Sequence, residues 1–277
     1  MRTRASAAAV LTGALALTAL AVPAAQADDP GAKRVAPFAA KGPADDSSGD
    51  TKISNVVVNG GKDVVLGTTT KKTFTVSYTA TDNKGIGSAD AMLWHGSNFD
   101  DFDNFIFSNE EEGAKCTKVN ATTSNCKSTF SVDVRADYFY NSEAGSWKTA
   151  VYAVANDGDF MEKDNAKTWR LQRASKLTVN ASPEPVKKGK TLTVTGALTR
   201  ANWESLKYGG YTQQSVQLQF RKKGSSTYST VKTIKSDSKG NLKTTVKAST
   251  SGYWRYSFAG TSTTPAVKAA GDYVAVN

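Results

Sequence analysis

Apolar and polar residues alternate along most of the chain from residue 53 onward. The stretch 74–80 has Phe, Val, Tyr and Ala at every second position, and 130–134 repeats this with Phe, Val and Val. Strict alternation is typical of a strand with one buried face. Further strands are expected at 53–58, 89–95, 147–155 and 166–171. Residues 51–172 therefore predict an all-β unit of about seven strands.

The same plan returns after residue 173. Leu177 with Val179 and Leu192 with Val194 each mark one buried face, and further strands are expected at 216–220, 228–234, 242–246, 254–258 and 273–276. Glycine-containing turns at 222–226 and 238–241 are typical of hairpins. Short strands at this spacing predict a Greek-key sandwich, and two in succession predict an all-β chain of two consecutive immunoglobulin-like β-sandwiches.

The first 27 residues carry the pattern of an export signal. Arg2 and Arg4 precede an apolar stretch at 7–22, and Ala-Gln-Ala at 25–27 is a small-residue cleavage pattern, so the mature chain is expected to begin at Asp28. No later apolar run is long enough to span a bilayer. Residues 28–50, rich in Ala, Gly, Pro, Asp and Ser, are expected to be a disordered tether. The protein is expected to be secreted, either extracellular or loosely associated with the cell wall.

Charge divides the two predicted sandwiches. Residues 50–172 carry 13 Lys and Arg against 17 Asp and Glu, whereas residues 173–277 carry 17 against 4. The net charges are therefore −4 and +13. We accordingly expect an acidic domain at 51–172 and a basic domain at 173–277.

Cys116 and Cys126 are the only two cysteines. In an exported chain, a close pair with strand-like flanks predicts one disulfide that closes a hairpin. The alternative is a metal site with two thiolate ligands, but structural zinc needs four ligands and the only histidine, His95, lies about twenty residues upstream.

Acidic residues gather in two loops of the first predicted sandwich. If immunoglobulin strand order holds, the loops at 82–88 and 156–165 lie at the same end. Their oxygen-bearing side chains would then suit weak binding of Ca²⁺. The alternative is that Asp and Asn occupy these loops only because they favour turn conformations. The expected metal ligands are Asp82, Asn83, Asp157, Asp159, Glu162 and Asp164.

The basic half favours an anionic partner, because a surface of one charge sign attracts polyanions. Candidates outside a cell are an anionic polymer of the envelope or an extracellular glycan. The alternative is that these lysines provide solubility and protect the sheet edges. The expected polyanion-binding residues are Lys187, Lys188, Arg221, Lys222, Lys223, Lys232 and Lys243.

A further acidic cluster, at 100–112, and a set of aromatic residues suggest either a contact between the two domains or stacking against sugar rings. This cluster does not fit a helix-loop-helix calcium hand, because Phe105 and Ile106 stand where that template needs an oxygen ligand and a glycine. Flat amphipathic rings are also favoured wherever two proteins meet. The residues expected to take part are Asp101, Asp103, Trp203, Tyr208 and Tyr211.

Catalysis and sequence-specific binding of nucleic acid are not expected. A single histidine leaves a catalytic triad one candidate base, and the chain has no G-x-S-x-G, H-E-x-x-H or phosphate-binding glycine motif. No helix is predicted that could enter a DNA groove.

Four short segments resemble known immunoglobulin-like modules. TDNKGI at 81–86 and ANDGD at 155–159 resemble a bacterial Ig-like module, and QLQFRKKG at 217–224 with GYWR at 252–255 resembles the Ig-like domain of secreted actinobacterial proteins. The resemblance covers most of 52–277 and implies the fold. Proteins like this are often labelled calcium-binding, but the resemblance brings no ligand motif. We therefore expect a secreted, non-enzymatic binding or structural protein. The alternative is a carbohydrate-binding module or an accessory to a glycan-active enzyme.

Overall fold

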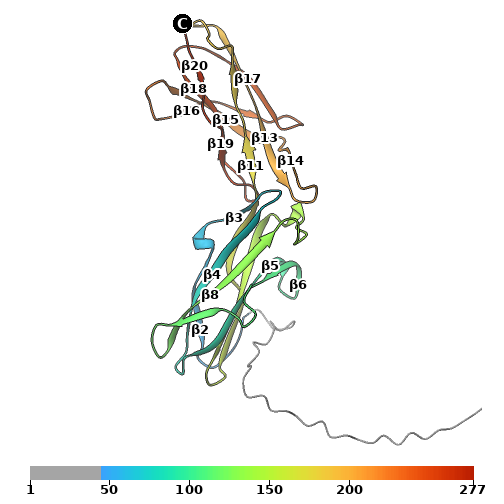
Figure 1. The fold of residues 1–277 in the computed structure, drawn as a ribbon, viewed down its shortest axis with the longest axis vertical. Helices are drawn as coiled ribbons and strands as arrows, with labels where there is room; N and C mark the ends of the chain where they lie inside the picture. Colours follow the sequence, from blue (N-terminus) through green and yellow to red (C-terminus); the bar gives the residue numbers. More distant parts are fainter. Residues whose placement is uncertain (1–44) are drawn as a thin grey trace, which may run out of the picture. The chain divides into compact units, whose positions relative to one another are not determined.

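The computed structural model describes residues 45–277, which form two β-sandwiches (Figure 1). The only helices in this range are two single 3₁₀ turns, Asn59–Gly61 and Asn141–Glu143. No helix among the described residues is long and apolar enough to cross a membrane. The expected signal at 1–27 and most of the expected tether, 28–44, lie outside the described residues.

The first sandwich has immunoglobulin strand order. One sheet runs β2 (Lys52–Val58), β4 (Lys71–Thr81), β8 (Thr123–Asp133), β7 (Lys115–Lys118). The other runs β1 (Asp46–Ser48), β10 (Phe160–Arg173), β9 (Gly145–Ala155), β5 (Ile86–Asn98), β6 (Asp101–Phe107), with β3 (Val64–Leu66) parallel to β10. These are the A-B-E-D and G-F-C-C′ sheets of the immunoglobulin fold.

The second sandwich repeats this order. β13 (Thr191–Asn202) pairs with β11 (Ser175–Leu177), β12 (Asn180–Ser182), β14 (Lys207–Gly210) and β17 (Asn241–Lys247). The facing sheet contains β16 (Ser229–Lys235), β15 (Ser215–Lys222), β18 (Gly252–Phe258), β19 (Val267–Lys268) and β20 (Asp272–Val274). The predicted fold class, two consecutive immunoglobulin-like sandwiches, is confirmed.

The alternating residues fill the two cores as the pattern predicts. In β4, the four apolar residues of 74–80 are all buried, and Phe74 lies opposite the buried Phe130 of β8. Trp147 and Trp169 lie with ring centroids 5.8 Å apart in the first core. In the second core, the hydroxyl of Tyr256 donates to the Val194 carbonyl across the sheets at 2.9 Å. Burial of such large side chains, each about 1.5–3 kcal/mol, holds the sheets face to face.

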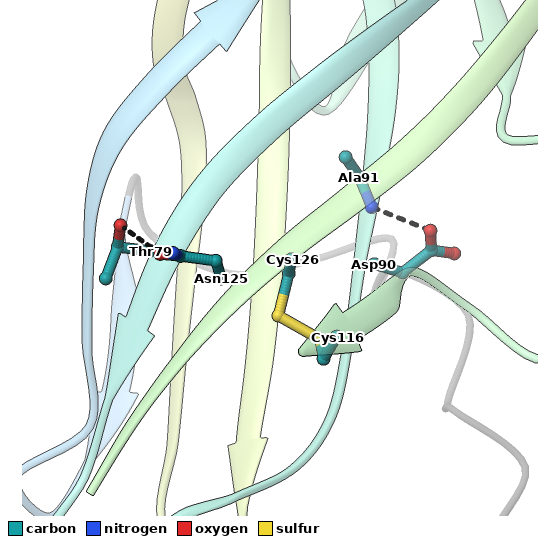
Figure 2. Close-up of a disulfide and its surroundings, with 6 residues drawn as sticks. All are labelled: Thr79, Asp90, Ala91, Cys116, Asn125 and Cys126. Carbon is teal, nitrogen blue, oxygen red and sulfur yellow. Dashed lines mark hydrogen bonds between the residues drawn. A yellow bond between two sulfur atoms is a disulfide. The ribbon is translucent and has the colours of Figure 1, made fainter. Parts of the chain in front are cut away.

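The disulfide forms as predicted between β7 and β8 (Figure 2). Cys116 and Cys126 are directly opposite each other in the strand register, with Cα atoms 4.0 Å apart. On the far side of β8, the hydroxyl of Thr79 in β4 donates to Asn125 at 3.0 Å (Figure 2). The disulfide therefore fixes the edge strand β7, which has only four residues, onto a long central strand.

One expected boundary needs correction. The tether was predicted to reach residue 50, but Asp46–Ser48 form β1 and pair with β10. Ala201 near the end of β13 and Trp203 just after it are buried in the first core, although their sequence belongs to the second sandwich. The division into domains at 51–172 and 173–277 stays a prediction.

Candidate ligand sites of the two sandwiches

Three carboxylates converge at one end of the first sandwich. Asp82 follows β4, Asp159 precedes β10, and Asp50 lies just before β2. One carboxylate oxygen from each lies within 4.8 Å of the others. Strand pairing causes this convergence, because Lys52 at the start of β2 is opposite Thr81 at the end of β4, and Ser48 of β1 is opposite Phe160 at the start of β10.

Hydrogen bonds hold this acidic cluster, which we define as Asp50, Asp82 and Asp159. Asp82 is 4% exposed and accepts from the Thr51 hydroxyl and the Lys84 N–H, both at 2.7 Å. Burial acts to raise the pKa of Asp82, but these hydrogen bonds outweigh it, and the pKa lies below its usual value. The backbone N–H of Asp50 donates to Asp159 at 3.2 Å. The cluster therefore combines one buried carboxylate, Asp82, with the exposed Asp50 and the half-buried Asp159.

The turn before β2 depends on a glycine. Gly49 has a φ of +77°, and a Cβ at this position would overlap the carboxylate of Asp159. Only glycine lets the backbone turn at this point while Asp159 approaches it.

The structure brings together some of the predicted calcium ligands and separates others. Asp82 and Asp159 meet, and the side-chain amide of Asn83 donates to Asp50 at 2.8 Å. Glu162 and Asp164 were expected in a loop but lie on β10, where Glu162 is opposite Asp46 of β1. Burial raises the pKa of both carboxyls, and the charge of Asp164 raises that of Glu162 further. Asp157 is exposed and accepts from the Asp159 N–H at 3.3 Å.

Sequence reasoning missed Asp50 because it was assigned to the tether. The expected pairing of the first two strands could have indicated it. An antiparallel A-B strand pair places the start of strand A beside the end of strand B, so an acid just before 53–58 had to lie near Asp82.

The predicted polyanion-binding residues are spread over several elements of the second sandwich. Lys187 and Lys188 precede β13, Lys232 lies on β16, and Lys243 lies on β17 in the opposite sheet. All six lysines of the set are exposed, whereas Arg221 is half-buried with its guanidinium 4.1 Å from the Tyr253 ring centroid. The six lysines therefore contribute to a positive electrostatic field over the whole sandwich, whereas Arg221 is held by its contact with Tyr253.

The residues expected in an interdomain or glycan contact lie in different surroundings. Asp103 on β6 lies 3.1 Å from His95, and Asp101 begins the same strand. Trp203 is in the first core, with its ring centroid 5.8 Å from that of Phe139. Tyr208 packs against that core below the Lys176 ammonium, and Tyr211 packs against Phe258. The proposed role of this set stays a prediction.

Exposed aromatic side chains follow the edge strand β6. Phe102, Phe105 and Phe107 form a ladder with centroid separations of 5.1 and 4.9 Å, and Phe107 is 58% exposed. A pocket of about 290 Å³ beside them is lined in part by Asn104, Ser131 and Asp137. Rings beside polar groups form a surface that suits an amphipathic partner.

Cysteine and histidine, which often support nucleophilic chemistry, make other contacts in the part of the chain that the structure describes. Both cysteines are in the disulfide, so neither offers a thiolate. The only histidine, His95, is next to Asp103 and packs against the Trp147 ring at 5.5 Å. That the chain is not an enzyme therefore stays a prediction.

Comparison with known proteins gives one family and several distant structures. A family of unknown function, DUF5707, matches residues 65–153, which lie within the first sandwich. No curated protein sequence matches the chain. The D00-D0 domain of intimin is 12% identical, with 80% of this chain and 99% of that one covered and a TM-score of 0.26. Titin Z1Z2 in complex with telethonin is 10% identical, with 82% and 96% covered and a TM-score of 0.21. An amphioxus IgVJ-C2 molecule is 9% identical, with 76% and 99% covered and a TM-score of 0.25. At such scores the fold assignment rests on the strand order above.

Proposed function

We propose that this chain is a secreted, non-enzymatic binding protein whose basic second sandwich attaches to an anionic polymer of the cell envelope or the extracellular space. The observation that carries the proposal is the unneutralised charge of residues 173–277. They carry a net +13, and none of the salt bridges within residues 45–277 involves them. Charges without internal partners are available to an external polyanion.

Retention on isolated cell envelopes across a salt series tests this proposal. The Debye length falls from about 10 Å at 0.1 M salt to about 3 Å at 1 M, so most bound protein should be released over that range. A variant with Lys187, Lys188, Lys222 and Lys223 changed to Gln should be released at lower salt. A matched variant with Lys52, Lys62, Lys71 and Lys72 changed to Gln, all in the acidic sandwich, should elute with the wild type. Equal elution of the two variants would contradict the proposal.

We further propose weak Ca²⁺ binding at the acidic cluster, with Asn83 as an additional oxygen donor. Hard cations prefer carboxylate and amide oxygens, and extracellular modules bind Ca²⁺ with dissociation constants of about 10⁻⁴ to 10⁻³ M. Calorimetry with millimolar CaCl₂ should show binding that Asp82→Asn abolishes. Asp157→Asn, in the same turn as Asp159 but outside the cluster, should leave it unchanged. No heat, together with melting that is insensitive to a chelator, would remove the idea.

A carbohydrate-binding role is the second candidate, and the exposed ladder of Phe102, Phe105 and Phe107 favours it. Rings of this kind stack against the apolar faces of sugars. Binding of neutral glycans that Phe105→Ser removes at unchanged melting temperature would support this role over the polyanion role. Under either role, we propose that residues 51–172 and 173–277 are separate functional domains.

A further inference from the structure

The outer face of the second sandwich carries an ordered set of arginine, tyrosine and glutamine side chains. Alternation in β15 turns Val216 and Leu218 into the core, and Gln219 and Arg221 toward the opposite face. In β18, Tyr253 and Arg255 alternate with the buried Trp254 and Tyr256. The register sets Gln219 opposite Arg255, Arg221 opposite Tyr253, and Tyr253 opposite Tyr273 of β20. We call these five residues, together with Tyr228, the Arg-Tyr face.

Ring contacts fix both guanidinium groups of this face. The guanidinium carbon of Arg255 lies 3.6 Å from the ring centroid of Tyr228, and that of Arg221 lies 4.1 Å from the centroid of Tyr253. The rings of Tyr253 and Tyr273 are 5.1 Å apart. Arg255 Nε donates to the Gln219 side chain at 2.9 Å, and Arg221 donates to the Ser225 carbonyl. Such cation–π contacts hold a charge in place without neutralising it.

Tyr228 reaches this face from the turn between β15 and β16. Its ring lies between the two arginines, 5.3 Å from Arg221 as well as 3.6 Å from Arg255. A Cβ at position 271 would overlap the Tyr228 hydroxyl, so the absence of a side chain at Gly271 provides the space that this hydroxyl occupies. The face is therefore assembled from three strands and one turn that folds back onto them.

No carboxylate of the second sandwich pairs with these arginines. Residues 173–277 contain four acids, and each has other surroundings. Asp237 accepts from backbone N–H groups of its own turn, Asp272 accepts from the Ala181 N–H at 2.7 Å, and Glu184 lies beside Asp272. Glu204 accepts from Asn141 of the first sandwich. The two guanidinium groups thus have no acidic partner among the described residues.

The chemistry of the face selects among anionic ligands. A guanidinium has five N–H donors in a planar fork, and one donor of each arginine is used within the described residues. The rest suit the bidentate geometry of a carboxylate. The arginines already lie over the rings of Tyr228 and Tyr253, so these rings are poor platforms for nucleobases. The phenol hydroxyl groups of the three tyrosines suit the hydroxyl groups of a sugar. The Gln219 amide already bonds Gln217, Thr230 and Arg255, so its part is to position Arg255.

We propose that the Arg-Tyr face, through Arg221, Arg255, Tyr228, Tyr253 and Tyr273, with Gln219 positioning Arg255, is the binding site for an acidic polysaccharide whose sugar carboxylates pair with the two guanidinium groups. This inference rests on the proposed function and names both the ligand class and its site. Outside this face, the same polymer is attracted only by the positive electrostatic field of the exposed lysines.

A charge-matched pair of variants in the full chain tests the site, with polygalacturonate as the probe. Arg255→Gln and Lys247→Gln each remove one positive charge, but the exposed Lys247 lies on β17 of the opposite sheet. The site predicts about tenfold weaker binding for Arg255→Gln, equivalent to about 1.4 kcal/mol, and less than twofold for Lys247→Gln. Arg255→Lys keeps the charge and loses the fork, and should also weaken binding severalfold at an unchanged melting temperature. Equal losses for Arg255→Gln and Lys247→Gln, with Arg255→Lys like wild type, would overturn the site.

Three further probes separate this inference from the proposed function. Dextran, a neutral polysaccharide, should not bind. If inorganic polyphosphate binds as tightly as polygalacturonate, binding depends only on the positive electrostatic field of the sandwich, so the proposed function holds but the specific site does not. If single-stranded oligo(dT) binds more tightly than polygalacturonate, the face prefers nucleic acid and the inference is wrong. If none of the three anionic polymers binds at low salt, the proposed function fails as well.

Discussion

Replacement of Trp203 by alanine should destabilise the first sandwich, although the residue belongs by sequence to the second. The side chain is 2% exposed and is part of the first core. Its Nε1 donates to the Leu66 carbonyl at 3.4 Å, but that carbonyl also accepts from the Ala174 N–H at 2.8 Å. Removal of the indole therefore leaves no unpaired acceptor, and the cost is lost packing plus a cavity. Substitutions of this kind cost about 3–5 kcal/mol.

Urea unfolding followed by far-UV circular dichroism measures this loss without relying on the removed fluorophore. The midpoint should fall while the slope with denaturant stays constant for the affected transition. Leu206→Ala is the matched control, because Leu206 lies three residues further along and is 38% exposed, and such surface changes usually stay within about 0.5 kcal/mol. If Trp203→Ala costs less than about 1 kcal/mol, the indole does not contribute to the core as described.

Four further predictions concern other groups. Burial raises the pKa of Asp90, and the nearby Glu110 adds to this effect, so the folded chain retains a proton that the unfolded chain releases. The stability that this proton confers is full below the unfolded pKa of about 3.9 and is lost as pH rises through the folded pKa. The melting temperature of Asp90→Asn should therefore rise relative to that of the wild type from pH 4 to pH 7. An equal difference in melting temperature at both pH values would refute this. Cys116→Ala with Cys126→Ala opens a loop of sequence separation 10 and should cost about 2–3 kcal/mol in denaturant unfolding, whereas no change would show that β7 is held by other contacts. Gly49→Ala should abolish any calcium-dependent rise in melting temperature through displacement of Asp159, and an intact rise would separate this turn from cation binding. Asp63→Asn removes the partner of the exposed Arg170 and should change stability by no more than about 1 kcal/mol in the same assay.

The sequence pattern predicted which residues face inward but not which side chains meet across elements. Alternation at 74–80 and 130–134 identified the core of β4 and β8, because a period of two is a local property of the backbone. The disulfide followed from the same local reasoning. The burial of Trp203 in the first core depends on how far β13 extends, and no local period encodes that length.

In the candidate sites, too, the sequence indicated features that follow from strand order but not contacts that depend on tertiary packing. Convergence of Asp82 with Asp159 follows from immunoglobulin strand order, which the sequence indicated. Glu162 and Asp164 were placed in a loop because polar residues obscured the start of β10. Arg255 and Tyr228 are far apart in sequence and meet only because the turn at 223–228 folds back onto the sheet. Such a contact depends on tertiary packing that alternation cannot reveal.

The most direct test of anionic-polymer binding at the Arg-Tyr face is the affinity of the full chain for polygalacturonate as a function of salt, measured for the wild type and for Arg221→Gln with Arg255→Gln. We predict binding that weakens steeply between 0.1 and 1 M salt and a double variant that binds at least tenfold more weakly at every salt concentration. Affinity that is independent of salt, or a double variant that matches the wild type, would contradict it.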